Sequence, residues 1–503
     1  MTQPHSFLPI IRAGIDTYRQ PVVYMREDCH LCRAEGFSAL TRVRIEAGGR
    51  SLIATLNVVT AEGWLPPDTA ALSIAAWNAL RPERQGVQAE FSHPEPPAST
   101  SAIRNKVFGG KFDAASASQI ITDMVAHRLS DLDLAAFVTA CAGDRLDIAE
   151  TIALTRAMTD AGQRIDWGTE PVLDKHCVGG LPGNRTTPIV VAVIAAAGGL
   201  IPKTSSRAIT SPAGTADTIE VMTPVDLDIT SMRRVVEAEG GCLAWGGGLD
   251  LSPADDILIR IERPLDFDSD GQLVASILSK KLAAGSTHVL IDMPVGPTAK
   301  VRTGAAAEDL SARLSAVAAE IGIELRVHCS DGTAPVGRGI GPSLEARDVL
   351  AVLRRSADHP PDLRDRALDI AGALLDMGVP DGRGRQTAET LLESGAAEAK
   401  FMAICAAQGG FHEPGIAPER AIETAGRRGR VTAIDNRRIA KIAKLAGAPG
   451  RQTAGVLLLA RPGDTVEPDT PLYEIHAETP GELAWARDYA RAGTSPFQVE
   501  AEK

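Results

Sequence analysis

Between about residue 170 and residue 332, short apolar runs alternate with longer amphipathic segments. The run PVLDKH at 171–176 precedes a helical pattern at 186–199, and LIPKTS at 200–205 follows directly. Two later runs, THVLIDMPVG at 287–296 and ELRVHCSDG at 324–332, flank another helical pattern. Alternation of this kind is typical of an α/β domain with a mostly parallel sheet. We therefore predict an α/β protein.

The remaining chain divides by composition into further parts. Its 503 residues exceed what one compact core holds, so several domains are expected. Strand-like runs such as PVVYM and SLIATLNVV predict a β-rich N-terminal domain over 1–92, and the Pro- and Ser-rich stretch 92–100 predicts a linker. Residues 100–168 are expected to form a helical domain, joined by further helices from elsewhere in the chain. We expect 169–424 to form the α/β domain and 425–503 a small α+β C-terminal domain.

Two amphipathic helices are predicted inside the helical domain. In LSDLDLAAFVTACAG, Ser130 and Asp133 form the pattern of a capping box, and an apolar run ending at Gly143 follows. The segment DIAETIALTRAMTDAG has helical periodicity and ends at Gly162. Together they predict that a helical layer precedes the α/β sheet.

The overall composition excludes several classes of function. A net charge of −12 argues against a broad nucleic-acid surface, although it allows a local basic pocket for one small anion. Seven scattered cysteines favour a reducing cytoplasm over a disulfide framework. The N-terminus lacks the pattern of a signal peptide, and the apolar run at 188–202 is too short for a membrane span. We expect a cytoplasmic protein with no nucleic-acid or membrane partner.

One pair of nearby cysteines is a candidate for metal binding. CHLC places His30 between Cys29 and Cys32, but a structural zinc site needs about four ligands and no second pair is evident. We therefore expect no metal site. His412 and His476 are isolated and are expected to be structural.

The motif DKHCVGGLPGNRTT, residues 174–187, has the features of an anion site. It lies at the predicted carboxyl end of a strand, where open α/β sheets bind ligands. Its glycines would let the backbone approach a ligand, Thr186 and Thr187 would open the next helix, and Lys175 adds positive charge. Neither the phosphate-loop nor the dinucleotide consensus is met. The same residues also suit a packing turn with Lys175 and His176 at a solvated rim.

A second polar loop follows the next predicted strand. PKTSSRAITSPAGTADTIE, residues 202–220, carries cations and many hydroxyl groups. Hydroxyl and backbone N–H groups together can saturate the oxygens of a phosphate. Two such loops at neighbouring sheet edges favour a ligand site over a pair of solvated turns.

Four motifs in the same order resemble the thymidine/pyrimidine-nucleoside phosphorylase family. These are DKHCVGGLPGN, IPKTSSRAITSPAGTAD, ASILSKKLAAG and DGTAPVGRGIGPSLEARDVL, and the resemblance runs from about residue 100 to the C-terminus. The forms GGLPGN and SSRAITS, with the extra N-terminal domain, resemble the branch of AMP phosphorylase and the longer bacterial thymidine phosphorylases. The resemblance implies a helical domain facing an α/β domain across a cleft that closes for reaction, and a homodimer or larger assembly.

The resemblance also implies roles for single residues. Those that match the phosphate-holding positions are Lys175, Thr187, Ser205 and Thr215. Cys177 replaces a residue that usually carries a hydroxyl, and a thiol is the weaker donor. His176 matches the histidine that faces the base, or else it only positions the loop.

The implied substrate positions lie in four places along the chain. They are Gly180, then Ser206, Arg207, Ala208, Ile209, Thr210 and Ser211, and finally Ser276 and Lys300. Asp268 matches the proton donor of the AMP phosphorylase branch, although Asp266 and Asp270 stand beside it. Ser276 and Lys280 are four residues apart, so on a helix they share one face. In shorter thymidine phosphorylases the matching pair binds the pyrimidine. No base-binding arginine aligns, since Arg260 and Arg263 both require a gap.

The reaction implied is phosphorolysis of the N-glycosidic bond of thymidine or a related pyrimidine nucleoside. Inorganic phosphate is then a co-substrate, no organic cofactor is needed, and the candidate catalytic residues are Asp268, His176 and Lys280. The alternative substrate is a nucleoside 5′-monophosphate such as AMP, whose 5′-phosphate Arg207 could hold bidentately. A third possibility is a non-catalytic nucleotide-binding protein.

Overall fold

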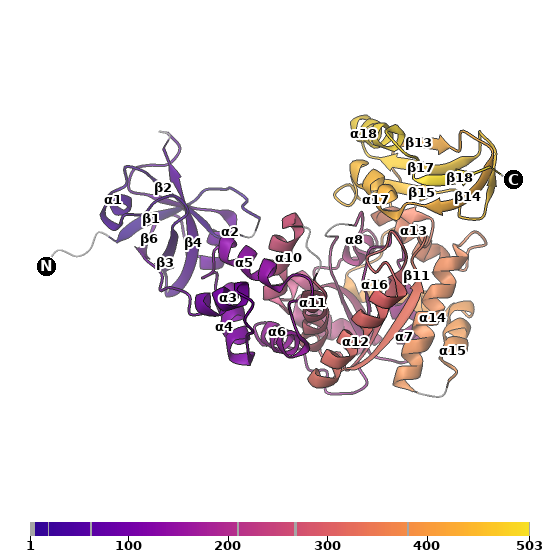
Figure 1. The fold of residues 1–503 in the computed structure, drawn as a ribbon, viewed down its shortest axis with the longest axis horizontal. Helices are drawn as coiled ribbons and strands as arrows, with labels where there is room; N and C mark the ends of the chain where they lie inside the picture. The colour runs from indigo at the N-terminus through magenta and orange to yellow at the C-terminus, as the bar shows by residue number, and fades with distance from the viewer. Residues whose placement is uncertain are drawn as a thin grey trace. The chain divides into compact units, whose positions relative to one another are not determined.

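The computed structural model describes residues 6–18, 20–60, 63–208, 211–265, 269–379 and 382–501 (Figure 1). The chain forms two compact units. One comprises residues 1–157 with 254–269, and the other comprises 158–253 with 270–503. No helix within the described ranges is both long and apolar enough to cross a membrane.

The first unit begins with a closed β-barrel. Its strands follow the order β1-β5-β2-β4-β3-β6, with bounds Phe7–Arg12, Ala70–Leu72, Val22–Arg26, Arg50–Val59, Arg42–Ala47 and Val87–Ser92. Alternate side chains of β3 (Val43, Ile45 and Ala47) point into the apolar core, as a strand period of two requires. Closure leaves no free strand edge, and the short helices α1 (His30–Glu35) and α2 (Ile74–Leu80) pack on the barrel.

Helices make up the rest of the first unit. They are α3 (Thr100–Val107), α4 (Ala114–Val125), α5 (Asp131–Cys141), most of α6 (Ile148–Asp160), and α10 (Pro253–Leu265). The predicted capping box is confirmed: Ser130 accepts from the Asp133 N–H, and the Asp133 carboxylate accepts from the Ser130 N–H. A buried ion pair of 2.6 Å between Lys106 and Glu150 ties α3 to α6.

The second unit contains the predicted parallel sheet. Strands β11 (Glu324–Asp331), β10 (His288–Val295) and β7 (Leu173–Cys177) pair in parallel, and so do β8 (Ile201–Ser205) and β9 (Gly241–Trp245). A parallel bridge between Val172 and Leu200 joins the two sets beside β7 and β8. The strand that comes first in the sequence, β7, therefore lies in the middle of the sheet. Strands β8 and β9 lie on one side of it, and β10 and β11 lie on the other. The β7–β10 boundary is a topological switch point, where open α/β sheets bind ligands at the carboxyl ends of the strands.

Helices cover this sheet. They are α7 (Thr187–Ala196), α8 (Thr215–Glu220), α9 (Ile229–Glu239), α11 (Asp270–Ala283), α12 (Gly304–Ile321), α13 (Pro342–Leu353), α14 (Pro361–Gly378), α15 (Gly384–Glu393) and α16 (Ala396–Gln408). Residues 187–195 of α7 are all buried, because this helix is apolar on every side and packs among α14, α15 and α16. The alternating pattern therefore predicted the α/β class correctly.

The C-terminal part of the second unit is a small α+β structure. One sheet has the order β12-β15-β17-β13, with bounds Gly339–Ile340, Gly455–Leu458, Pro471–Ala477 and Glu419–Thr424. The other has the order β16-β14-β18, with bounds Thr465–Val466, Gly429–Ile434 and Phe497–Glu500. Helices α17 (Asn436–Leu445) and α18 (Pro480–Arg491) pack on them. Strand β12 belongs to the α/β part of the chain and pairs with β15. Its backbone hydrogen bonds therefore connect the C-terminal structure to the α/β part.

Candidate functional site

Lys175 is buried at the switch point of the sheet. Its side chain is 1% exposed, and Nζ donates to Thr186 Oγ1 at 2.8 Å and to Thr187 Oγ1 at 3.4 Å. Asp292 on β10 lies 3.5 Å from the same nitrogen. Both threonines stand at the start of α7, where the Thr186 N–H already donates to the Asn184 carbonyl at 2.9 Å and Pro188 has no N–H to offer. The structure thus joins a cation, two hydroxyls and a helix N-terminus, and it excludes the solvated rim as the environment of Lys175.

A second buried charge cluster centres on Asp174. Adjacent residues of a strand point to opposite faces, so Asp174 and Lys175 enter different ion pairs. Asp174 lies 2.7 Å from Lys281 Nζ and 3.3 Å from Lys203 Nζ. Burial opposes the charge of Asp174, but the two ammonium groups outweigh it and hold the pKa of this carboxyl below its usual range. Burial lowers the pKa of Lys203 to about 7, and Asp174 only partly offsets this.

His176 follows Lys175 at the end of β7 and is held neutral. Burial in the protein lowers the pKa of His176 well below its usual value of 6.5, even though the side chain keeps some contact with solvent. Four neighbouring ammonium groups lower it further, those of Lys281, Lys203, Lys280 and Lys175. At neutral pH the imidazole can therefore donate or accept a hydrogen bond, but it has no acidic proton to give.

Cys177 faces Asp292 across the β7–β10 pair. Burial raises the pKa of its thiol to about 11, and the Asp292 carboxylate raises it as well, so the group stays protonated. Asn184 Nδ2 donates to Asp292 at 3.0 Å and to the Cys177 sulfur at 3.4 Å. Ser330 donates to the other Asp292 oxygen at 3.0 Å. Cys177 thus belongs to the set of groups that fixes Asp292 beside Lys175.

The glycines of this motif serve close packing of the chain. Both Gly180 and Gly183 have positive φ, +81° and +69°. A Cβ on Gly180 would lie 2.4 Å from the backbone nitrogen of Lys300, and one on Gly183 would lie 2.1 Å from the carbonyl oxygen of Val336. The turn therefore brings Gly180 against Lys300, another predicted substrate position whose own side chain is exposed. Packing explains these two glycines, where the sequence suggested room for a ligand.

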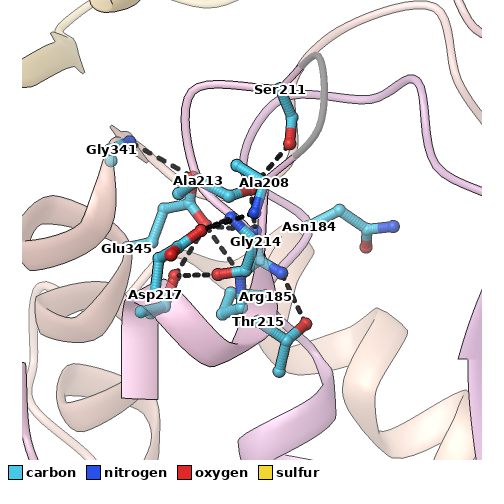
Figure 2. Close-up of polar contacts among 12 residues, drawn as sticks. Asn184, Arg185, Ala208, Ser211, Ala213, Gly214, Thr215, Asp217, Gly341 and Glu345 are labelled. Atoms are coloured by element: carbon cyan, nitrogen blue, oxygen red, sulfur yellow. Dashed lines mark hydrogen bonds and ion pairs between the residues drawn. The ribbon is translucent and has the colours of Figure 1, made fainter. Parts of the chain in front are cut away.

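Arg185 joins the starts of two helices (Figure 2). Its guanidinium donates to Thr215 Oγ1 at 2.6 Å, to the Ala213 carbonyl at 3.0 Å and to Glu345 on α13 at 2.7 Å. Burial raises the pKa of Glu345 to about 7, although Arg185 and the Gly341 N–H act in the opposite direction. Thr215 is thus placed at the start of α8, and a residue that the sequence left without a role holds it there.

The loop after β8 is organised by carboxylates. Asp217 accepts from the backbone N–H groups of Ala208 at 2.7 Å and Gly214 at 2.8 Å. Arg207 forms a bidentate pair with Glu220 at 2.5 and 2.7 Å and stacks on the Trp245 ring at 4.7 Å. Predicted positions Ile209 and Thr210 lie outside the described residues. The Arg207 side chain is therefore already bound to residues of this chain, Glu220 and Trp245.

The other predicted positions fall into separate groups. Ser205 Oγ, at the end of β8, is buried and has no hydrogen-bond partner among the described residues, so it can serve a ligand. Ser206 is exposed, and Ser211 donates to the Ala213 carbonyl at 2.9 Å. On α11, Lys280 Nζ donates to Ser276 Oγ at 3.2 Å, as their four-residue spacing predicts.

Three further residues were candidates for contact with the base: Asp268, Arg260 and Arg263. Asp268 lies outside the described residues, as does the side chain of Arg263. Arg260 forms a bidentate pair with Asp131, at 2.8 and 3.0 Å, within the first unit. That arginine is therefore engaged by a carboxylate of its own unit.

Comparisons with known proteins identify the family of this chain. The model of the helical bundle domain of the glycosyl transferase family matches residues 100–162, and the α/β domain model of that family matches 169–398. The model of the C-terminal domain of pyrimidine nucleoside phosphorylase matches 430–495. A protein of Acidovorax sp. (strain JS42) named "Putative thymidine phosphorylase 1" is 58% identical over 98% of this chain and 96% of its own. The chain belongs to the pyrimidine nucleoside phosphorylase family.

Other relatives place the chain in the longer branch of this family. Proteins named "Putative thymidine phosphorylase" from Polaromonas sp. (strain JS666) and Hahella chejuensis are 58% and 56% identical, each over 99% of this chain. The anthranilate phosphoribosyltransferase of Thermus thermophilus shares the fold, with a TM-score of 0.51 and 19% identity over 61% of this chain and 99% of that one. The predicted family, fold class and enzyme class are confirmed, and the protein is a pentosyltransferase.

Several residues of this candidate site were not predicted from the sequence. Lys281 and Glu345 lie inside the motifs ASILSKKLAAG and DGTAPVGRGIGPSLEARDVL but were given no role, and Asp292 lies outside the quoted motifs. Asp292 had one usable signal, because it lies near the end of an apolar strand beside the switch point. Thr186 was recognised as a helix start, but its bond to Lys175 follows only from the fold.

Proposed function

We propose that the protein cleaves thymidine or a related pyrimidine nucleoside with inorganic phosphate. The products are the free base and (deoxy)ribose 1-phosphate. The observation that carries the proposal is the environment of Lys175, a buried cation bonded to two threonine hydroxyls at a helix N-terminus. The relatives named as thymidine phosphorylases support the choice of substrate.

Phosphate is held at the carboxyl ends of β7 and β8 in this proposal. Lys175 supplies the charge, Thr187 and Ser205 supply hydroxyls, and Thr215 is presented by Arg185. Donors that are positioned before the reaction stabilise the phosphate while its oxygen attacks the anomeric carbon. Lys175 and Asp292 are buried 3.5 Å apart, so the Lys175 ammonium must become accessible from the ligand side when phosphate binds.

The departing base needs a proton or a positive group. His176 is neutral, so its role is to hydrogen-bond the base and not to protonate it. From the family resemblance, Asp268 is the proposed proton donor. The Ser276–Lys280 pair on α11 then binds the pyrimidine, with the Lys280 ammonium as the positive group.

A nucleoside is favoured over its 5′-monophosphate by the state of Arg207. A 5′-phosphate would need a free bidentate cation, but the Arg207 guanidinium already binds both oxygens of Glu220. Capture of a phosphate there would separate this pair and leave the Glu220 carboxylate beside a second anion. The chain therefore favours an uncharged sugar 5′ end.

A substrate panel tests the proposal. The purified full-length protein is incubated with thymidine, uridine, AMP, CMP or UMP, with and without phosphate, and released base is measured by chromatography. We expect base only from thymidine or uridine, and only with phosphate. Release from the monophosphates alone would contradict the proposal in favour of nucleotide phosphorolysis, and no release from any compound would leave only a binding function.

The family resemblance further leads us to propose a homodimer or a larger assembly. Light scattering of the purified protein tests this directly. A mass of one chain at micromolar concentration would contradict it.

A further inference from the structure

Three side chains of types that can bind a metal lie close together on the N-terminal barrel. This part of the chain has no role in the proposed reaction. Cys29 and His30 lie where β2 leads into α1, and Asp68 lies in the turn before β5. The Cys29 sulfur, the His30 nitrogen Nδ1 and a carboxylate oxygen of Asp68 all lie within 4.8 Å of one another. The fold therefore joins residues that are 38 positions apart in the sequence.

The contacts among these three groups are direct. His30 Nδ1 lies 2.7 Å from Asp68 Oδ1, and the His30 backbone N–H donates to the same oxygen at 3.0 Å. The Cys29 sulfur lies within 4.8 Å of both of these ligand atoms. The ligand atoms thus converge on one point, and a cation there would replace hydrogen bonds that already hold the groups together.

Burial gives the cluster a closed side and an open side. Cys29 is fully buried, whereas the side chains of His30 and Asp68 are 40% and 53% exposed. An ion can therefore enter from solvent between the imidazole and the carboxylate and meet the sulfur beneath them. The exposed side leaves space for a water molecule as a further ligand.

The donor set is characteristic of zinc. A thiolate, an imidazole and a carboxylate are the ligands that Zn²⁺ takes in proteins, and three protein ligands with one water complete a tetrahedron. Bonds of about 2.0–2.3 Å place tetrahedral ligand atoms about 3.3–3.6 Å apart. The His30–Asp68 pair, at 2.7 Å, is closer than this and needs to open by about half an ångström.

We propose that Cys29 Sγ, His30 Nδ1 and the Asp68 carboxylate bind one zinc ion, with water in the fourth position. Binding releases the thiol proton to solvent and ties the β2–α1 junction to the turn before β5. Cys32 is not a ligand in this assignment, because its thiol is directed to Met25 Sδ at 3.6 Å in the barrel core and to Cys29. The site has one ligand fewer than a closed structural zinc site, and its occupant stabilises the barrel by joining these two loops.

This zinc site could not be recognised from the sequence. The CHLC pair suggested four ligands from two cysteine pairs, and no second pair exists in the chain. The third ligand is an aspartate brought in by barrel closure, and an aspartate in a turn carries no recognisable metal signature.

Metal analysis of the full-length protein tests the proposal. Protein loaded with zinc and dialysed extensively should retain about one zinc per chain, and the cobalt-substituted protein should show the charge-transfer band of a thiolate ligand. Cys29→Ser and Asp68→Asn should each lower zinc affinity about 10-fold or more. Cys32→Ser and Cys329→Ser, the latter at an exposed cysteine on β11, should retain zinc.

Two results would overturn the proposal. One is wild-type protein that holds no stoichiometric zinc after loading and instead forms a Cys29–Cys32 disulfide on mild oxidation, which would make the pair a redox dithiol. The other is equal zinc retention by wild type and Asp68→Asn, a partly exposed position at which a folded variant is expected. Neither result depends on phosphorolysis, so the proposed function stands or fails separately.

Discussion

The ends of β7 and β8 carry similar residues in the sequence but different environments in the fold. Each strand leads into a loop with a cation and hydroxyl groups. Lys175 is 1% exposed and gives its hydrogen bonds to threonine hydroxyls, whereas Arg207 is 35% exposed and gives its hydrogen bonds to carboxylates. Lys175 has one carboxylate, Asp292, at 3.5 Å, whereas the Arg207 guanidinium is bonded to both oxygens of Glu220 and lies 3.4 Å from Asp217. We therefore propose that Lys175 at the end of β7, and not Arg207 after β8, supplies the cation for phosphate.

Lys175→Ala should cause the largest loss of activity. Removal of the charge at the switch point should lower kcat/KM for phosphorolysis about 10³-fold, close to 4 kcal/mol of transition-state stabilisation. Steady-state kinetics with thymidine and varied phosphate measure this loss. Lys400→Ala is the matched control, since Lys400 on α16 pairs with Glu239 on α9 at 2.9 Å and has no role in the proposed site. Equal activity of the two variants would mean that Lys175 contributes no more to the reaction than a lysine outside the site.

Acidification should destabilise the wild-type protein through His176. Its folded pKa is depressed below the unfolded value of about 6.5, so below pH 6.5 the unfolded chain binds a proton that the native state does not. The stability contribution is complete above pH 6.5 and falls by up to about 1.4 kcal/mol per pH unit below it. Between pH 7.5 and pH 5.5 the melting temperature of the wild type should fall more steeply than that of His176→Gln. Substitution of the exposed His412 by Gln should leave the slope unchanged, and a parallel slope in His176→Gln would contradict the buried, neutral imidazole.

Arg207→Ala should have a smaller effect on activity than Lys175→Ala. It removes the Glu220 pair and the Trp245 stacking that order the loop, and we expect about a fivefold lower kcat/KM, near 1 kcal/mol, with thymidine. In the same assay Glu220→Gln should lower kcat/KM by a similar factor, because both substitutions weaken the pair between Arg207 and Glu220. A loss as large as that of Lys175→Ala would show that Arg207 touches a substrate and that the contrast between the two strand ends is wrong.

Ser205→Ala should have the smallest effect. The buried hydroxyl makes no hydrogen bond to any described residue, so its loss should leave the melting temperature unchanged or slightly higher. The KM for phosphate should rise about threefold to tenfold with kcat little changed, because one neutral hydrogen bond to the ligand is lost. A clear drop in melting temperature with an unchanged KM would make Ser205 a structural residue.

Local patterns in the sequence predicted the elements of the fold. The strand at 173–177, the capped helix at 131–141 and the buried helix at 187–196 follow from apolar periodicity, a capping box and a terminal glycine. These features depend on residues a few positions apart, which a single sequence displays. The motif after β7 likewise placed Lys175 beside a helix start.

The partners of the site residues could not be predicted in this way. Asp292 reaches Lys175 only because β10 joins the sheet beside β7, and Glu345 reaches Arg185 only because α13 packs beside α8. Asp68 meets Cys29 through closure of the barrel. Each of these contacts is set by topology, and the identity of an acidic residue far along the chain reveals nothing about which cation it will face.

Phosphorus NMR of the complete reaction tests the central claim most directly. Wild-type protein with thymidine and inorganic phosphate should convert phosphate into a sugar 1-phosphate in equal amount to the thymine released, and Lys175→Ala should show neither product on the same time scale. Release of thymine without consumption of phosphate, or an unchanged conversion by Lys175→Ala, would contradict a phosphate site at the end of β7.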